Sequence, residues 1–405
     1  MNAFSFIGLI WEIFRKDKPD LEKIQEKGLL SVKIGQMFAL RIDFLKPETC
    51  AHLGKLYQQN TAMGSEDFGK LLDMSVDKGW RDNFETIDEE PLATASVAQV
   101  HRAKLKDHSK NPEVIVKLIK RDFTRDFERD VDKVLGLFKI LIFFYPKLRK
   151  VANPVALLEM IKKDTLSELD LNNELKHQKV LREIYGKYKD AVDLSHLKFP
   201  EMHPGLSNEK VLVVEEIKGK TFQERLEEGS LDYNELLNLF HIHGFYIFAV
   251  GTFHGDIHPG NIILHEGNIY FIDCGAMATV SERLRKGLFN FMKHLSLYEF
   301  EECARWLHEM SEIKLSDKKY DKFQKNFLKL YKDFPGKTVS EVSLTEQMMY
   351  TIKMGINHGM EFGKGMFPII KSLMYLDGMV IKCKPDAVLM EDMRENVKEL
   401  ERYMQ

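Results

Sequence analysis

Two short motifs near the middle of the chain carry side chains that could perform chemistry. The first is the octapeptide HGDIHPGN at His254–Asn261, and the second is the tripeptide DCG at Asp273–Gly275. Between them, two short apolar runs flank a Gly-Asn pair, a pattern that is typical of a β-hairpin. Such a hairpin brings Asn261, before its first strand, beside Asp273, after its second strand, with Asp256 close by. The sequence thus predicts two carboxylates and an amide gathered in one place.

This set of side chains suits metal-assisted phosphoryl transfer. Mg²⁺ prefers one or two carboxylates together with phosphate oxygens, so we expect Asn261 and Asp273 to hold the metal. The spacing D-x-x-x-x-N followed by D-x-G is that of a kinase catalytic loop, whose first Asp orients or deprotonates the acceptor, and we assign this role to Asp256. His254 and His258 could suggest zinc instead. The Gly and Pro inside the octapeptide disfavour the helix that would place both imidazoles on one face.

The composition bounds the class of protein. With 405 residues, the chain can bury a sizeable core and hold two or three subdomains. Its net charge of −3 gives no electrostatic footprint for nucleic acid. The four cysteines are scattered without a CxxC pair, which suits a reducing compartment, and Cys274 is expected to be a small, semi-buried side chain. We therefore expect a cytoplasmic protein with no nucleic-acid partner.

Two apolar stretches bear on membrane contact, although neither reaches the roughly 18 residues of a spanning helix. Phe4–Phe14 and Val134–Tyr145 are each followed by basic residues. A secretory signal would carry its positive charge before the apolar run, so we exclude a signal peptide. Either stretch could lie in a membrane interface, which would make the protein peripheral to a membrane. Packing of each stretch against the protein's own core is the alternative that we favour.

The order of predicted elements indicates an α+β, protein-kinase-like, two-lobed fold with a helical N-terminal extension and a helical C-terminal tail. Helices are expected before residue 85, strands at Val114–Leu118 and Lys210–Glu215, and charged helices over 120–185. A helix over Leu236–Ala249 leads into the catalytic loop, and helices follow from Ser281 onward. We divide the chain into a helical extension with the K-x-G-Q motif (1–85), an N-lobe with a helical insertion (86–218), a C-lobe (219–330) and a helical tail (331–405).

In such a fold, Lys117 ends a strand and would hold the nucleotide phosphates. Its partner is expected to be a helical glutamate that fixes the ammonium. Val213, Val214 and Glu215 would form the hinge whose backbone groups bond the nucleotide base.

Further motifs resemble those of the UbiB (AarF-domain-containing, ADCK-like) family of atypical kinases. Lys33–Gln36 matches its K-x-G-Q signature, and Arg41–Leu45 is similar to the R-x-D-L-L stretch that follows it. Pro91–Leu105 resembles the family's Ala-rich loop, which replaces the usual Gly-rich loop. Glu168–Asp170 matches its E-x-D, and Glu174 matches its helical glutamate. The resemblance extends over roughly residues 20–300 and adds to the match of the two catalytic motifs.

The resemblance implies an ATP-binding, Mg²⁺-dependent kinase or ATPase that supports isoprenoid quinone or other prenyl-lipid metabolism at a membrane. Glu174 would pair with Lys117, and the phosphates would be covered by Leu92, Ala93, Thr94, Ala95, Ser96, Val97, Ala98, Gln99 and Val100. The residues expected to keep protein substrates out are Lys33, Gln36, Glu168 and Asp170. We place Asp170 and Glu174 on one face of a single helix, which leaves Glu168 to meet the K-x-G-Q segment. The expected ligands are ATP or ADP and a phenolic or prenyl-lipid quinone precursor.

Two other classes of function are compatible with part of the pattern. A small-molecule kinase of the aminoglycoside or choline type shares the catalytic loop and D-x-G, but it lacks the Ala-rich loop and K-x-G-Q. A pseudokinase scaffold would bind nucleotide without turnover, and the intact Asp256, Asn261 and Asp273 argue against it. The acceptor, the partner proteins and the oligomeric state are left open by the sequence.

Overall fold

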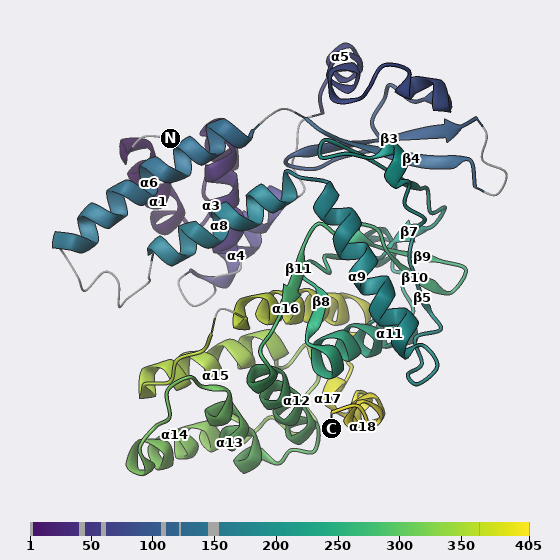
Figure 1. Ribbon diagram of the computed structural model, residues 1–405. Coiled ribbons are helices and arrows are strands. Elements are labelled where there is room, and N and C mark those ends of the chain that lie inside the picture. The colour runs from purple at the N-terminus through teal and green to yellow at the C-terminus, as the bar shows by residue number, and fades with distance from the viewer. Residues whose placement is uncertain are drawn as a thin grey trace. The chain divides into compact units, whose positions relative to one another are not determined.

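The computed structural model describes residues 3–39, 45–57, 62–106, 111–120, 123–144, 154–363 and 365–404. The chain forms two compact units, whose elements are labelled in Figure 1. Unit 1 comprises Met1–Lys176 and Pro200–Glu216, and unit 2 comprises His177–Phe199 and Ile217–Gln405.

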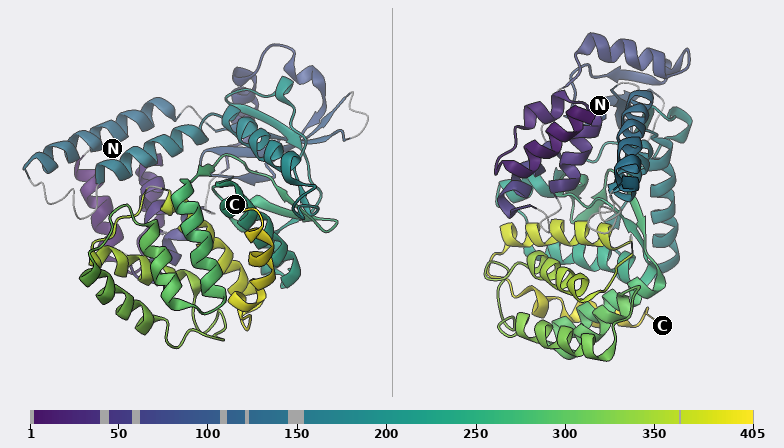
Figure 2. Two further views of the ribbon diagram at one scale, coloured as in Figure 1. Left: turned by 60° about the horizontal axis from the view of Figure 1, so that its bottom comes forward. Right: turned by 90° about the vertical axis from the view of Figure 1, so that its left-hand side faces the viewer.

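The first part of unit 1 is helical, as predicted. Its helices are α1 (Ala3–Arg15), α2 (Leu21–Glu26), α3 (Leu29–Ala39), α4 (Pro47–Gly54), α6 (Thr124–Phe144) and α8 (Pro154–Glu168). Helices α6 and α8 lie side by side in both Figures 1 and 2. Leu9, Ile34 and Val131 belong to one buried cluster that joins α1, α3 and α6. The charged helices predicted between residues 120 and 185 are therefore confirmed, and they share a core with the N-terminal helices.

Helix α1 is apolar on two faces. Phe6, Leu9 and Ile13 are buried in the helical core, which confirms the expected packing for one face. The opposite face is exposed, and its relative accessibilities are Phe4 87%, Ile7 58%, Trp11 56% and Phe14 45%. Of the second apolar stretch, Val134 and Leu135 are buried in the same core, whereas Tyr145 lies outside the described residues. Among the described residues, no helix is both long enough and apolar enough to cross a bilayer.

The second part of unit 1 is an antiparallel sheet with the order β1 (Phe84–Ile87), β3 (Ala98–Leu105), β4 (Glu113–Ile119) and β6 (Val211–Glu215). The short β2 (Ala93–Thr94) pairs with β3. Both predicted strands are confirmed as β4 and β6, while the predicted N-terminal helical region ends before Phe84, which begins β1. Helix α5 (Ser65–Ser75) buries Phe68 and Leu72 in one cluster with Val116 of β4. Because side chains alternate along a strand, Lys117 is placed on the opposite face from Val116.

Unit 2 contains the predicted hairpin. Its sheet has the order β5 (Leu197–Lys198), β10 (Asn268–Phe271), β9 (Ile262–His265) and β7 (Lys220–Thr221), and β9 pairs with β10 in antiparallel register. The turn differs from the expected Gly-Asn pair, because Asn268 already belongs to β10. Glu266 and Gly267 form the turn with φ of 49° and 73°. Positive φ at both central residues is what a tight hairpin turn requires.

Most of the remainder of unit 2 is helical, which confirms the predicted run of helices from Ser281 onward. Helix α11 (Tyr233–Gly244) continues into a π-helix (Phe245–Val250), as expected for the segment that precedes the catalytic loop. The other helices of this unit are α10 (Phe222–Glu227), α12 (Glu282–Ser296), α13 (Phe300–Met310), α14 (Asp317–Leu330), α15 (Leu344–His358), α16 (Met366–Cys383), α17 (Leu389–Asp392) and α18 (Arg394–Glu401). Helix α9 (Asn172–Tyr188) begins in unit 1 and ends in unit 2. One buried cluster extends through unit 2 from Leu181 to Leu400.

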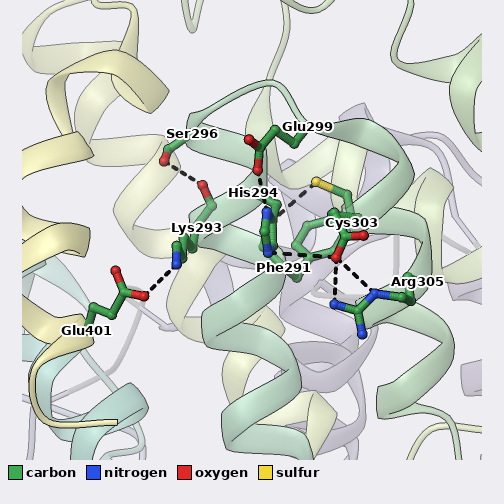
Figure 3. A network of polar contacts seen from close by, with 9 residues as sticks. Phe291, Lys293, His294, Ser296, Glu299, Cys303, Arg305 and Glu401 are labelled. Carbon is green, nitrogen blue, oxygen red and sulfur yellow. Dashed lines mark hydrogen bonds and ion pairs between the residues drawn. The ribbon is translucent and has the colours of Figure 1, made fainter.

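Polar contacts join α12 to its neighbours α13 and α18 (Figure 3). His294 of α12 contacts Glu299 at 2.5 Å, and Lys293 contacts Glu401 of α18 at 2.5 Å. Cys303 of α13 donates through its thiol to the carbonyl of Phe291 at 3.7 Å. Burial raises the pKa of the Cys303 thiol, so this cysteine is a packing residue and not a nucleophile.

Candidate active site

The segment that precedes the octapeptide is fixed at a glycine. The π-helix ends at Gly251, which has φ of 81°, a left-handed conformation that favours glycine. Arg285 of α12 donates to the carbonyls of Phe248 and Ala249 at 2.7 and 2.8 Å. This satisfies carbonyls that the end of a helix leaves without partners. Strand β8 (Thr252–His254) follows and pairs with β11 (Met277–Thr279).

His254 connects the two catalytic motifs. Its Nδ1 accepts from the backbone N–H of Asp256 at 3.1 Å, and its Nε2 donates to the carbonyl of Asp273 at 2.5 Å. Burial lowers the pKa of His254, which keeps the ring neutral and suits one accepting and one donating nitrogen. The side chain is therefore a fixed spacer between the loop of Asp256 and the segment of Asp273.

Asn261 is held by the same loop. Its Nδ2 donates to the carbonyl of Asp256 at 3.1 Å, and its own carbonyl accepts from the N–H of Ile272 at 3.1 Å. The predicted proximity of Asn261 to the end of the hairpin is thus confirmed. Asp273 accepts through Oδ1 from the N–H of Gly275 at 2.9 Å, which forms the turn of the D-x-G tripeptide.

The donor set of this loop fits Mg²⁺. Asn261 uses its amide nitrogen inside the loop, so its oxygen is the atom that a metal could take, and Asp273 contributes a carboxylate. Two protein oxygens suit Mg²⁺, which fills its other positions with phosphate oxygens and water. Across the described ranges, no group of three or more His, Cys, Asp or Glu side chains is arranged to hold a metal by itself.

The second histidine of the octapeptide also has a structural contact. His258 accepts through Nδ1 from the N–H of Gly260 at 3.0 Å, and burial lowers its pKa. His177 of α9 donates through Nδ1 to the carbonyl of Cys274 at 3.0 Å, which holds the D-x-G tripeptide from its other side. Cys274 itself is buried, as expected for a packing residue.

Lys371 of α16 contacts Asp256. The distance from Nζ to Oδ1 is 3.1 Å, and the two side chains are both largely buried. Lys371 belongs to no sequence motif, because it lies in a helix more than a hundred positions after the loop. No local signal in the sequence could have found it.

Unit 1 brings the predicted strand lysine to the predicted glutamate. Lys117 Nζ lies 2.8 Å from the Glu174 carboxylate, and the Glu174 side chain is only 3% exposed. Fifty-seven positions separate the two residues, and the intervening chain forms the helices α6 and α8. A buried carboxylate that fixes an ammonium is the expected arrangement for a lysine that holds phosphates.

The Ala-rich segment is a β-hairpin. Leu92 donates to the carbonyl of Val100, and the N–H of Ala95 donates to the carbonyl of Ala98 at 2.8 Å, which closes a tight turn without glycine. Of the predicted phosphate-covering residues, Leu92, Ala93 and Ala95 are exposed, Thr94, Ser96 and Val100 are partly buried, and Val97, Ala98 and Gln99 are buried.

The side-chain amide of Gln99 is hydrogen-bonded within unit 1. Its Oε1 accepts from the N–H of Met63 at 2.7 Å, and its Nε2 lies 2.9 Å from the ring of His101. The amide therefore anchors the segment before α5. Lys120 follows the same strand as Lys117 and donates from its backbone N–H to Val97 at 2.9 Å. Burial lowers the pKa of Lys120 to about 8, and no sequence motif pointed to this residue.

The K-x-G-Q segment lies on α3. Lys33 forms an ion pair with Glu168 at the end of α8, as the resemblance implied. Gln36 is buried and donates to the carbonyl of Leu56 at 3.0 Å. A Cβ at Gly35 would lie 2.5 Å from the Leu56 side chain, so any other residue at this helix position would require Leu56 to move. Residues 41–44 of the motif that follows lie outside the described residues.

The expected helix through Asp170 and Glu174 is wrong. Helix α8 ends at Glu168, and α9 begins at Asn172. Asp170 lies between them and accepts through Oδ1 from the N–H of Asn172 at 3.0 Å. A side-chain acceptor that satisfies an N–H at the start of a helix stabilises a new N-terminus, which is why the chain breaks here. Glu174 therefore meets Lys117 from the first turn of α9, and Asp170 shapes the connection.

Glu215, the expected hinge residue, ends β6. Its N–H donates to the carbonyl of Glu201 at 2.8 Å, and its carboxylate accepts from Asn111 at 2.7 Å. The N–H of Glu216 donates to the carbonyl of Glu113 at 3.0 Å. These backbone donors are therefore used within unit 1.

Comparisons with known proteins agree with this architecture. Residues 55–307 match the ABC1 atypical kinase-like domain. A protein of Tolumonas auensis named "Probable protein kinase UbiB" is 27% identical over 362 residues, which cover 87% of this chain and 64% of that protein. A protein of the same name from Vibrio parahaemolyticus is 28% identical over 386 residues, covering 93% of this chain and 69% of its own length. This chain thus spans about two thirds of the length of these relatives.

A solved structure, the Rv3197–erythromycin complex from Mycobacterium tuberculosis, matches with a TM-score of 0.52 at 18% identity. The match covers 88% of this chain and 90% of that chain, and it shows similarity of fold. The predicted two-lobed, kinase-like α+β class is therefore confirmed, as is the resemblance to UbiB proteins. The chain belongs to the ABC1 atypical kinase-like family.

Proposed function

We propose that this chain is a Mg²⁺-dependent, ATP-binding atypical kinase or ATPase that supports isoprenoid quinone or other prenyl-lipid metabolism. The observation that carries the proposal is the connected geometry of Asp256, Asn261 and Asp273. His254 is hydrogen-bonded to the backbone of both Asp256 and Asp273. Asn261 donates to the carbonyl of Asp256. This arrangement favours an active enzyme over a nucleotide-binding scaffold.

The chemistry assigned to the site is transfer of the γ-phosphoryl group. The oxygen of water or of an acceptor hydroxyl forms a bond to the γ-phosphorus. The bond from that phosphorus to the bridging oxygen breaks, and its electron pair leaves with ADP. Asp256 orients the acceptor and takes its proton.

Other residues hold the nucleotide and the metal. Lys117, fixed by Glu174, would hold phosphate oxygens, and Asn261 and Asp273 would hold Mg²⁺. When bound, the metal supplies positive charge that offsets the charge developing on the transferred group.

Two features support a small acceptor or water over a protein acceptor. Kinases that act on proteins cover the phosphates with a Gly-rich loop, whereas this chain has a tight hairpin in which residues 92–100 include no glycine. The Lys33–Glu168 ion pair fixes the K-x-G-Q segment, as expected of a gate. Both also distinguish this chain from small-molecule kinases of the aminoglycoside type.

A link to lipids is supported by the exposed apolar face of α1 and is implied by the resemblance to the UbiB family. Aromatic and aliphatic side chains beside basic residues favour a membrane interface, where prenyl lipids reside. We therefore assign a peripheral membrane contact to α1 and a phenolic or prenyl-lipid quinone precursor as the ligand class.

The test is nucleotide turnover by the full chain, with and without anionic vesicles and soluble phenols as precursor analogues. We expect Mg²⁺-dependent ADP release by the unmodified protein, increased by vesicles or phenols. Asp256→Asn should lower turnover by roughly 10²–10⁴ with nearly unchanged ATP affinity. Equal turnover by Asp256→Asn would contradict the assigned site, and absence of turnover by the unmodified protein under every condition would contradict the enzyme.

A further inference from the structure

The Asp256 carboxylate is ion-paired to a lysine outside both catalytic motifs. Lys371 Nζ lies 3.1 Å from Asp256 Oδ1, and the side chains are 16% and 27% exposed. We propose that Lys371 is a positioning residue of the active site, which holds Asp256 in the orientation that accepts the acceptor's proton. This role rests on the proposed function and extends it to a helix of the C-terminal region.

The lysine is itself fixed in place. It belongs to α16, whose Ile369 and Leu373 are buried in the core of unit 2. Its ammonium lies 5.8 Å from the centroid of the Tyr375 ring, one turn further along the helix. The ring of His258 meets Tyr375 edge to face at a centroid distance of 5.3 Å. Packing on this ion pair restrains both side chains. An exposed ion pair contributes little to stability, because two mobile side chains must be ordered to form it.

The octapeptide supplies no cation of its own at this position. His254 and His258 each use Nδ1 to accept a backbone N–H, from Asp256 and from Gly260. A ring nitrogen that accepts a hydrogen bond carries no proton, so both rings are neutral. The positive charge beside the carboxylate therefore comes from α16.

In this geometry, the two oxygens of the Asp256 carboxylate have different roles. Lys371 engages Oδ1, which leaves Oδ2 as the oxygen that receives the proton of the water or acceptor hydroxyl. The new bond is from the acceptor oxygen to the γ-phosphorus, and the electron pair of the broken bond leaves with ADP. Loss of Lys371 would let the carboxylate rotate, and a small misplacement of a catalytic group is enough to reduce turnover strongly.

The experiment compares Lys371→Met, Lys371→Arg, Asp256→Asn and the double variant Lys371→Met/Asp256→Asn in the full chain. We expect Lys371→Met to lower kcat by about 10²-fold while the Kd for ATP changes by less than about threefold. Lys371→Arg should recover most of the loss, because it keeps the charge. The double variant should be no slower than Asp256→Asn, because residues that act as a unit are not additive. Lys353→Ala, an exposed lysine of α15, is the control for loss of one positive charge.

The outcomes separate this role from a merely structural contact. Unchanged kcat in Lys371→Met, or an additive loss in the double variant, would overturn it while leaving the proposed function intact. An equal loss in Lys353→Ala would likewise overturn it, because the effect would then be one of net charge. If Lys371→Met does not fold, Lys371→Gln replaces it in the same comparison. An unmodified protein without turnover would overturn the proposed function and this role together.

Discussion

Lys33 and Glu168 form an ion pair in unit 1, although 135 positions separate them in the chain. The pair joins α3, which carries the K-x-G-Q motif, to the last residue of α8. Glu168 is followed by the connection through Asp170, and α9 begins at Asn172. The contact therefore fixes the motif to the same connection that places Glu174 against Lys117.

The first prediction concerns this pair as a gate. Lys33→Ala should release the K-x-G-Q segment and raise self-phosphorylation of the chain, and Glu168→Gln should act in the same direction. The measurement is incorporation of radiolabelled phosphate into the chain and into a generic protein acceptor. Lys70→Ala, which removes an exposed ion pair with Glu66 on α5, is the matched control. Robust labelling of protein acceptors by the unmodified chain would show that no gate exists.

A second prediction concerns Gly35 of the same motif. Gly35→Ala places a Cβ 2.5 Å from Leu56 Cδ1, and Leu56 is fully buried, so its side chain has little room to move. We expect the free energy of unfolding to fall by about 1–3 kcal/mol, the usual cost of overpacking. Urea denaturation of the variant and the unmodified protein measures this change in the free energy of unfolding.

Gly69→Ala in helix α5 is the control for this substitution. The nearest heavy atom to a Cβ there is 4.0 Å away, so only the gain in helix propensity remains, and stability should rise by up to about 1 kcal/mol. Equal effects of the two substitutions would mean that close packing does not explain the glycine of K-x-G-Q.

How much of the fold and the site could be predicted from the sequence depends on how far apart the interacting residues lie in the chain. The hairpin that brings Asn261 to Asp273 is a local feature, encoded by two strands and a turn, and it was predicted. The Lys117–Glu174 and Lys33–Glu168 pairs are distant in sequence and were accessible through motif resemblance. Asp170 was misassigned because helical spacing was extended through a residue that caps a new helix.

Lys371 illustrates what local patterns leave out. Its contact with Asp256 depends on how α16 packs in unit 2, and a single lysine in an amphipathic helix carries no signal of that packing. His177 is a similar case, because its bond to the Cys274 carbonyl joins α9 to a loop almost a hundred residues later. Such contacts are set by tertiary packing, which periodicity does not encode.

The third prediction addresses the metal. If Asn261 and Asp273 hold Mg²⁺, EDTA should weaken ATP binding, and so should Asp273→Asn, which keeps the side chain's shape but removes the charge that attracts the metal. Titration calorimetry with ATP, with and without Mg²⁺, measures both effects. Cys274→Ser is the neighbouring control, since Cys274 is a packing residue. ATP affinity that resists both EDTA and Asp273→Asn would exclude the assigned site.

The fourth prediction concerns pH and His243 of α11. Within the described structure, neither ring nitrogen of His243 has a hydrogen-bond partner, and burial lowers its pKa to about 3. Because the folded state disfavours protonation, stability is greatest above the unfolded pKa of about 6.5 and is lost as pH falls from there toward 3. Each pH unit in this window costs up to about 1.4 kcal/mol for this group.

His243→Leu should remove this contribution. We expect the variant to lose less stability than the unmodified protein between about pH 7 and about pH 5, as measured by urea denaturation. At neutral pH it should be at least as stable, because an unsatisfied buried polar group is replaced by an apolar one. His254 and His258, whose pKa values burial also lowers, keep part of the pH dependence in both proteins. Identical pH profiles would show that His243 does not resist protonation.

The last prediction concerns the exposed face of α1. Ile7 and Trp11 lie on this face, and the Arg15 guanidinium lies 5.7 Å from the Trp11 ring centroid, so an aromatic and a cation are presented together. An aromatic side chain at the headgroup level beside a basic residue favours anionic lipid. We expect the protein to float with acidic vesicles and added salt to reduce the recovery. Ile7→Ser/Trp11→Ser should lower vesicle binding by about tenfold or more, since each buried apolar side chain contributes about 1.5–3 kcal/mol.

Leu297→Ser, at an exposed apolar residue of unit 2, should leave binding unchanged. Binding that survives the double substitution would place the membrane contact elsewhere, and no flotation at low salt would mean that this face of α1 serves a contact other than lipid.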